Sequence, residues 1–177
     1  MVCPHPDRAE AALVLLRRVL DELRLELADA KTRIVDGRTG REGFDFLGYH
    51  FRMKPKRSNP RVLFAACWPS KPAVAAAKAR IRDLTPTRRI GRPAIMVVAD
   101  VNVFLRGWGA YFRHGNSTPQ FQALDDFVTE RIARFIARKH GRRNWRWGLR
   151  ELLKSSTQLG IIRLAGTVNY PAAHAAR

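Results

Sequence analysis

The sequence predicts an α+β protein, in which an N-terminal helix and short antiparallel strands are followed by a mostly α-helical three-helix bundle. Apolar residues recur at helical spacing near residues 7–24, 70–84, 94–113 and 120–140. Between the first and second of these segments, short apolar runs alternate with turn-forming residues, as is typical of strands. A chain of 177 residues is long enough for one domain with a hydrophobic core, or for two small units.

The first third of the chain predicts one helix and two strands. Pro6 and Asp7, with Glu10 three residues after Asp7, are typical of a helix start, and apolar residues then recur at helical spacing to about residue 24. Residues 32–35 and 44–51 have the composition of strands, and the turn-rich residues 36–40 separate them.

A basic connector precedes the second helix. Residues 53–59 are polar and interrupted by proline, so we expect a loop and a domain boundary there, followed by a strand at about residues 62–67. Ser70 is the expected N-cap of the helix over residues 70–84. The outer face of that helix carries Lys71, Lys78 and Arg82.

The helix over residues 94–113 has two distinct faces at 3.6 residues per turn. Its apolar face holds Val98, Val101, Leu105, Trp108 and Phe112. Its opposite, outward face holds Asn102, Arg106, Gly109 and Arg113. The two internal glycines, at positions 107 and 109, each cost roughly 1 kcal/mol relative to alanine, which indicates that a neighbouring helix or a phosphate approaches closely. We expect Trp108 to pack in the core.

The helix over residues 120–140 places Arg131, Arg134 and Arg138 beside an apolar stripe, and Gly141 is its expected C-cap. Beyond it, residues 142–147 are basic and contain two tryptophans, which we expect to add phosphate contacts and base stacking. A short helix is predicted at 149–154 and a frayed end from residue 167.

Positive charge is concentrated in the last two thirds of the chain. Residues 1–51 hold 8 Lys/Arg against 9 Asp/Glu, whereas residues 52–177 hold 25 against 6, which divides the net charge of +18 into −1 and +19. Arginine outnumbers lysine 26 to 7, and arginine suits forked contacts to phosphate. Nucleic acid is therefore the expected partner, with an anionic membrane surface as the alternative.

Several classes of protein are not indicated. The chain has no run of 18 apolar residues, so we expect no membrane span, and its first residues do not form a signal or transit peptide. We expect an intracellular, cytoplasmic protein. Cys3 and Cys67 lie far apart, so neither a disulfide framework nor a zinc site is indicated, and we expect no metal and no cofactor.

Three motifs in the same order resemble the C-terminal part of group II intron reverse transcriptases, which are also maturases. Leu25 to Val35 resembles the end of the polymerase palm, and the run Phe46-Leu47-Gly48-Tyr49 resembles the family's FLGY motif. The run from Leu105 to Arg113 is similar to the maturase-specific LRGW…NYF signature, and Phe121 to Asp125 continues it. The resemblance covers about residues 8–143, and its departure at Val103-Phe104, where the family often has a proline, affects only the start of a helix.

The resemblance implies roles for several residues. The FLGY hairpin would act as a primer grip in which Gly48 allows close approach, although a core strand with buried Phe44, Phe46 and Tyr49 is the alternative. Lys31 would contact nucleic acid or simply be solvated. The three-helix part would be the thumb, also called domain X, which binds structured intron RNA and the primer-template. The residues that we expect to bind nucleic acid are Lys31, Gly48, Lys54, Lys56, Arg57, Lys71, Lys78, Arg88, Arg89, Asn102, Arg106, Gly109, Arg113, Arg131, Arg134, Arg138, Arg142 and Arg143.

The family's polymerase motif, Tyr-X-Asp-Asp, is expected just before the first helix and is not in this sequence. Two-metal phosphoryl transfer needs carboxylates that converge on ions ~4 Å apart. Asp125 and Asp126 are adjacent on a helix and diverge by about 100°, so we read them as helix-surface or capping carboxylates. We therefore expect no catalytic residues and no enzyme activity of the chain on its own.

The resulting domain prediction has four parts. Residues 1–52 are a palm remnant with the FLGY hairpin, 53–69 a basic connector, 70–143 the three-helix domain, and 144–177 a basic, partly disordered tail. The expected function is an RNA-binding maturase module that aids intron splicing and folding. The alternatives are one half of a split reverse transcriptase, partnered by an upstream-encoded palm fragment, and a nonfunctional pseudogene product.

Overall fold

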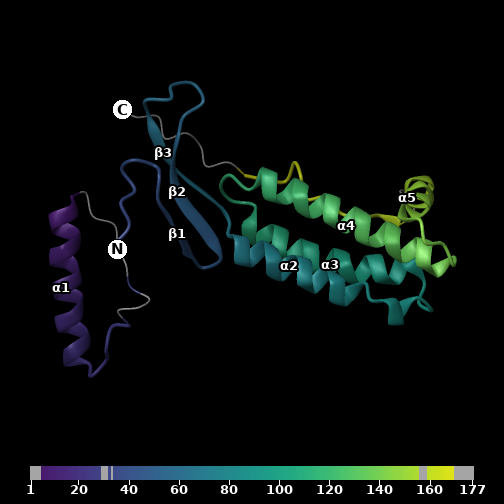
Figure 1. Ribbon diagram of the computed structural model, residues 1–177, viewed down its shortest axis with the longest axis horizontal. Coiled ribbons are helices and arrows are strands. Elements are labelled where there is room, and N and C mark those ends of the chain that lie inside the picture. The colour runs from purple at the N-terminus through teal and green to yellow at the C-terminus, as the bar shows by residue number, and fades with distance from the viewer. Residues whose placement is uncertain (1–4, 29–31, 33, 156–158, 170–177) are drawn as a thin grey trace. The chain divides into compact units, whose positions relative to one another are not determined.

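The computed structural model describes residues 5–28, 32, 34–155 and 159–169 (Figure 1). Its helices and strands follow one another as α1 (Pro6–Glu22), β1 (Gly43–Phe46), β2 (Tyr49–Pro55), β3 (Leu63–Pro69), α2 (Lys71–Leu84), the 3-10 turn η2 (Thr87–Arg89), α3 (Ala94–Phe112), α4 (Thr118–Lys139) and α5 (Trp145–Lys154). The predicted α+β class is confirmed. The chain divides into two compact units: residues 1–44 with 52–65, and residues 45–51 with 66–177.

The first unit contains α1, which has the predicted bounds to within two residues. Its apolar side chains Val14, Leu15 and Leu23 are more than half exposed. The predicted strand at 32–35 is wrong, because the described residues of that segment form no strand and Thr32 instead donates its hydroxyl to the carbonyl of Ala28.

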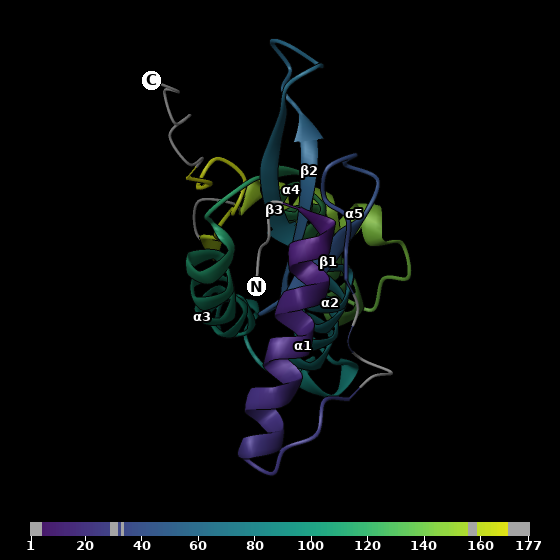
Figure 2. The same cartoon turned by 90° about the vertical axis from the view of Figure 1, so that its left-hand side faces the viewer.

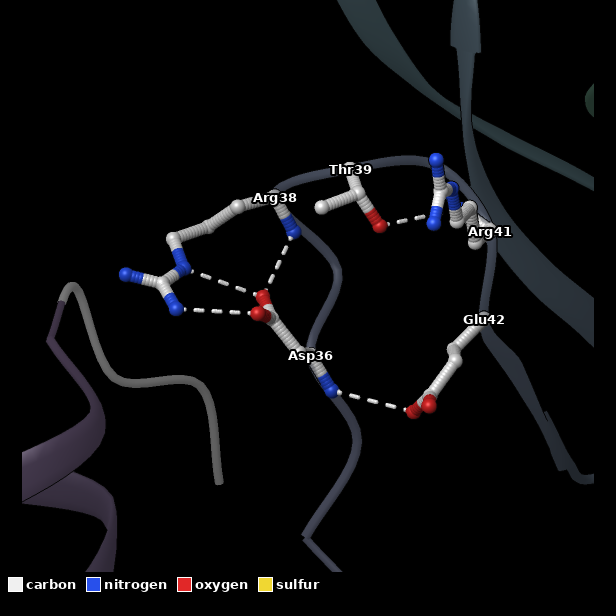
Figure 3. Close-up of polar contacts among 5 residues, drawn as sticks. All are labelled: Asp36, Arg38, Thr39, Arg41 and Glu42. Carbon is white, nitrogen blue, oxygen red and sulfur yellow. Dashed lines mark hydrogen bonds and ion pairs between the residues drawn. The ribbon is translucent and has the colours of Figure 1, made fainter.

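The loop before β1 is held by its own charged side chains (Figure 3). The Arg38 side chain donates to both carboxylate oxygens of Asp36, at 2.9 and 3.0 Å, and the Arg38 backbone N–H donates to the same carboxylate. These contacts lower the pKa of the Asp36 carboxyl to about 2. The Asp36 backbone N–H in turn donates to Glu42, which closes the loop.

The three strands form one antiparallel sheet in the order β1-β2-β3. The segment predicted as one strand over 44–51 is split by a turn at Leu47 and Gly48, whose φ angles of +48° and +80° reverse the chain. The loop predicted from Met53 is wrong in its first part. Strand β2 continues to Pro55, and pairing reaches Lys56, whose N–H donates to the carbonyl of Val62 just before β3.

Helices α2, α3 and α4 lie side by side and enclose the core (Figures 1 and 2). The predicted N-cap of α2 is confirmed, whereas the C-cap of α4 is His140 and the predicted Gly141 is the next residue, with a φ of +66°. The Ser70 hydroxyl accepts from the backbone N–H of Ala73, and after α4 the N–H groups of Gly141 and Arg142 donate to the carbonyls of Arg138 and Ala137. The largest fully buried core side chains include Ile81, Val97, Val98, Val101, Leu105, Phe121, Leu124, Val128 and Ile132.

Helix α3 is long and apolar enough to cross a membrane on length and composition alone. Its residues Val97, Val101 and Leu105 are fully buried in the bundle, however, where they pack with side chains of α2 and α4. Burial in the bundle accounts for this face of α3, whereas Ile95, Met96 and Val103 of the same helix are exposed.

The segment predicted as a basic tail contains helix α5 (Trp145–Lys154). Helix α5 begins at Trp145, four residues before the predicted start, and is capped by the Asn144 side chain, which accepts from the N–H of Arg146. Gly148 lies directly against the backbone of α4 at Ala133. Residues 159–169 then return to the bundle, where Leu164 is buried.

Candidate nucleic-acid interface

Five cations gather on one face of the bundle, formed by α2 and α4. We call Lys78, Arg82, Arg131, Arg134 and Arg138 the α2/α4 basic face. Lys78 and Arg82 of α2 both lie over the Phe127 ring of α4, at 5.3 and 5.2 Å from its centroid. These cation–π contacts hold both side chains above the junction of the two helices.

Arg131 lies at the centre of the α2/α4 basic face and ties α4 to the end of α2. Its guanidinium donates to the hydroxyl of Thr85, at 3.1 and 3.0 Å, and to the Thr85 carbonyl at 2.9 Å. Burial lowers the pKa of Arg131, and repulsion from Arg138, Arg82 and Arg134 lowers it further. Three other arginines therefore lie close enough to Arg131 to repel its charge.

Glu130 lies beside these cations and pairs with Arg134 at 2.6 Å. Arg134 also lies 6.0 Å from the Trp145 ring, and Arg138 makes a long bond to the Thr87 hydroxyl. The excess of positive charge makes this face an attractive surface for a polyanion.

The structure thus brings together four of the predicted residues: Lys78, Arg131, Arg134 and Arg138. Arg82 belongs with them but was not predicted as a site residue. Its spacing from Lys71 and Lys78 already placed it on that side of the helix, so the signal was present in the sequence.

The two arginines predicted in the loop after α2 have different surroundings. Arg88 is exposed, whereas Arg89 pairs with Asp100 of α3 at 2.9 Å and donates to the carbonyl of Leu84. Arg92 reaches the same Asp100 carboxylate at 3.3 Å. Arg89 therefore closes the loop onto α3, and its charge is shared with a carboxylate.

The outward row predicted on α3 is half wrong. Asn102 is buried, and its amide bonds to the backbone at Gly160 and Ile162, while Gly109 lies under Leu164. Both are covered by the returning segment 159–169. Arg106 and Arg113 are exposed as expected. The two glycines of α3 therefore differ. Gly109 contacts the returning segment, whereas an added Cβ atom at Gly107 would have nothing within 4 Å.

The tryptophans pack against protein. Trp108 is half-buried in the core, as predicted, with ring contacts to Phe112 and Phe121. The rings of Trp145 and Trp147 pack on the core and are covered by Arg134 and by Arg142 respectively. Base stacking, which we expected of these two tryptophans, is thus disfavoured in this conformation.

The FLGY turn is latched to the end of α3. Tyr111 donates its hydroxyl to the Leu47 carbonyl at 2.8 Å, and Tyr49 donates to the Tyr111 carbonyl. An added Cβ at Gly48 would lie 3.2 Å from the Phe112 ring, so this glycine serves close packing within the protein.

The core-strand reading of the hairpin is wrong for two of its three aromatic residues. Phe46 is 59% exposed and Phe44 is also exposed, because both lie on β1 at the edge of the sheet. Tyr49 is half-buried and packs against Phe112, as expected.

The remaining predicted residues take no part in the contacts that define the α2/α4 basic face, or lie outside the described residues. Lys54, Lys56 and Arg57 are exposed in the β2–β3 hairpin of the first unit. Lys71 is exposed in the first turn of α2, and Arg142 and Arg143 are exposed before α5. Lys31 lies outside the described residues.

Asp125 is buried, although the sequence predicted a carboxylate on the helix surface or at a cap. Its side chain is 4% exposed, and it accepts hydrogen bonds from the backbone N–H groups of Leu164 and Ala165. Asp126 is exposed, as expected. Within the described ranges, no three His, Cys, Asp or Glu side chains gather as a metal site requires.

The fold and this face define a helical-bundle protein with positive charge concentrated along two of its helices. Residues 74–153 match the family model for the group II intron, maturase-specific domain. The matched residues run from α2 into α5, and the resemblance to group II intron maturases seen in the sequence is confirmed for this part of the chain. No curated protein matches the chain significantly.

Proposed function

We propose that this chain is an RNA-binding module of a group II intron maturase, and that it aids the folding and splicing of the intron RNA. The observation that carries the proposal is the α2/α4 basic face, where four arginines and a lysine lie together and Glu130 pairs with one of them. A phosphate backbone placed there relieves the repulsion among the arginines.

Contacts on this face are expected to go to the backbone of the RNA. Cations lie over the rings of Phe127 and Trp145, which disfavours stacking of a base on those ring faces. Guanidinium and ammonium groups that point outward position a nucleic acid through its phosphates without reading its sequence. Such binding favours folded RNA, in which phosphates are closely spaced.

A second row on α3 extends the proposed interface. Arg106 and Arg113 are exposed two turns apart on α3, and Gly107 leaves the helix surface open beside Arg106. Gly107 costs helix stability of roughly 1 kcal/mol relative to alanine, and no contact in the described protein accounts for it. We propose that RNA approaches the helix backbone there.

The test is RNA affinity as a function of salt, measured by fluorescence anisotropy with a transcribed group II intron RNA. Each phosphate that the protein neutralises adds about 0.7–0.9 to the slope of log K against log salt, and we expect a slope that reflects ~5 or more phosphates. A slope near zero would reject an electrostatic interface.

A matched pair of variants locates the contact. The double variant Lys78→Gln/Arg82→Gln removes two cations from the α2/α4 basic face, and we expect it to lower the slope by about 1.4–1.8. Arg80→Gln removes a charge from an exposed residue on the opposite side of α2 and should change the slope little. If the double variant and Arg80→Gln lowered the slope equally per charge removed, the α2/α4 basic face would not be the place where RNA binds. Circular dichroism of each variant checks that the bundle is intact.

We propose further that the chain has no polymerase activity alone and that its FLGY hairpin contacts a primer-template only in a larger assembly. Exposed apolar residues of α1 and Phe46 on β1 favour a second candidate, completion of a reverse transcriptase whose palm is a separate chain. Mixing this protein with such a palm fragment and assaying cDNA synthesis tests it. Synthesis that is equal with and without this protein would reject the second candidate.

A further inference from the structure

The segment from Leu159 to Asn169, which we call the C-terminal strap, lies along α3 and α4 and is held by hydrogen bonds to its backbone and by apolar side chains. Asn102 of α3 makes two bonds to it. The Asn102 amide nitrogen donates to the carbonyl of Gly160 at 2.8 Å, and its amide oxygen accepts from the N–H of Ile162 at 3.0 Å. The pair of bonds spans one residue and uses no strap side chain.

Asp125 of α4 holds the next part of the C-terminal strap in the same manner. One carboxylate oxygen accepts from the N–H of Leu164 at 2.9 Å, and the other accepts from the N–H of Ala165 at 2.9 Å. The carboxylate is almost fully buried, and a buried carboxylate is costly unless it is hydrogen-bonded. The strap thus supplies the donors that this charge needs.

Leu164 is the most deeply buried side chain of the C-terminal strap, and Leu159, Ile161 and Val168 also pack against the core. Leu164 is 3% exposed and lies over Gly109, where an added Cβ would come within 2.5 Å of the leucine Cδ2. Near the end of the strap, the N–H of Asn169 donates to the carbonyl of Arg113, and the Asn169 carbonyl accepts from Gly115. The strap thus lies along a groove of α3 and α4. The groove is formed by the Asn102 amide, the Asp125 carboxylate and the space over Gly109.

We propose that the groove formed by Asn102, Gly109 and Asp125 is a peptide-binding site that recognises the backbone of an extended peptide and buries a leucine side chain over Gly109. In this protein, its ligand is the C-terminal strap, which binds as a separable element. The match to the maturase-specific domain ends at residue 153, so the matched domain contains the groove and not the strap. The inference does not depend on RNA binding.

The first test uses the full chain and a fluorescein-labelled peptide of residues 159–169. Leu164→Glu replaces the buried anchor with a charged side chain and should release the C-terminal strap from the groove. We expect the labelled peptide to bind this variant at least about 10-fold more tightly than it binds the unmodified chain, whose groove is filled. Arg163→Glu is the matched control, because Arg163 is exposed on the same strap and its substitution should leave the groove filled.

A third variant tests whether the peptide is recognised by the Asp125 carboxylate. Adding Asp125→Ala to Leu164→Glu leaves the strap N–H groups without an acceptor, and should weaken peptide binding by roughly 10-fold or more. Equal peptide binding to the single and double variants would overturn the proposal, as would absence of binding to a folded Leu164→Glu chain.

Hydrogen exchange on the unmodified chain decides the matter if Leu164→Glu fails to fold. A separable strap opens without unfolding of the bundle, so the amides of Ile162, Leu164 and Ala165 should exchange faster than those of Leu105 and Val128, in a process independent of denaturant. Exchange of all five amides at the rate of global unfolding would overturn the proposal.

Discussion

Replacing Gly148 by alanine should destabilise the bundle, because α5 crosses α4 at this position. An added Cβ would overlap the carbonyl oxygen of Ala133 and lie 2.9 Å from its carbonyl carbon and 3.0 Å from the nitrogen of Ala137. Favourable carbon contacts lie at ~3.5–4.0 Å, so α5 has to withdraw by about 1 Å. The atoms in the way are backbone atoms of a helix, which cannot move aside singly.

The cost follows from what α5 buries. A gap of about 1 Å forfeits up to half of the dispersion energy across it, and Leu152, which packs in this interface, is 4% exposed. Partial loss of that packing costs about 2–4 kcal/mol, and the higher helix propensity of alanine returns roughly 1 kcal/mol. We expect a net loss of about 2 kcal/mol, which lowers the Tm by roughly 4–8 °C.

The assay is urea unfolding followed by tryptophan fluorescence. The matched control is Gly107→Ala in α3, where nothing lies within 4 Å of the added Cβ and stability should rise by about 1 kcal/mol. The same substitution should therefore have opposite signs at the two positions. If Gly148→Ala were as stable as the unmodified protein, the close crossing of α4 and α5 would be refuted.

Three further predictions follow from contacts described above. Arg131→Lys removes the forked bonds to Thr85 and should lower the free energy of unfolding by about 1–3 kcal/mol, measured by urea unfolding; no change would show that the fork carries no stability. Leu47→Gly relieves a φ of +48° and should raise stability by about 1 kcal/mol in the same assay, and a loss would contradict strain at this turn. The carboxyl of Asp36 should titrate near pH 2 by NMR, and Arg38→Gln should move its pKa back toward 3.8. Because folding lowers this pKa, its stabilising contribution is present above about pH 4 and is lost as the pH falls toward 2; an unchanged midpoint in Arg38→Gln would exclude Arg38 as the cause.

The helices could be predicted from the sequence because their signals are local. Ser70 and Gly141 mark ends through bonds to residues within five positions, and the period of 3.6 residues placed Arg131 and Lys78 on outward faces. The strand expected at 32–35 failed for the opposite reason, because a strand requires a partner and composition alone does not show whether one is present.

The errors on α3 and α4 have a single physical origin. Periodicity showed that Asn102 and Asp125 lie on polar or boundary positions, but the segment that covers them is about 40–60 residues away in the chain. A polar side chain that binds a distant backbone looks the same in a sequence as one that faces water. The row of arginines on α4 was easier to predict, because all its members lie on one helix and their spacing alone places them on one face.

The latch on the FLGY turn gives the tip of the hairpin freedom to vary. Tyr111 holds the turn through the carbonyl of Leu47, and Gly48 provides room for Phe112, while the Leu47 side chain is 68% exposed. Mutations that change this side chain leave the hydrogen bond in place. Natural selection can therefore adjust the outermost residue of the hairpin to whatever it meets, without altering how the hairpin is attached to the bundle.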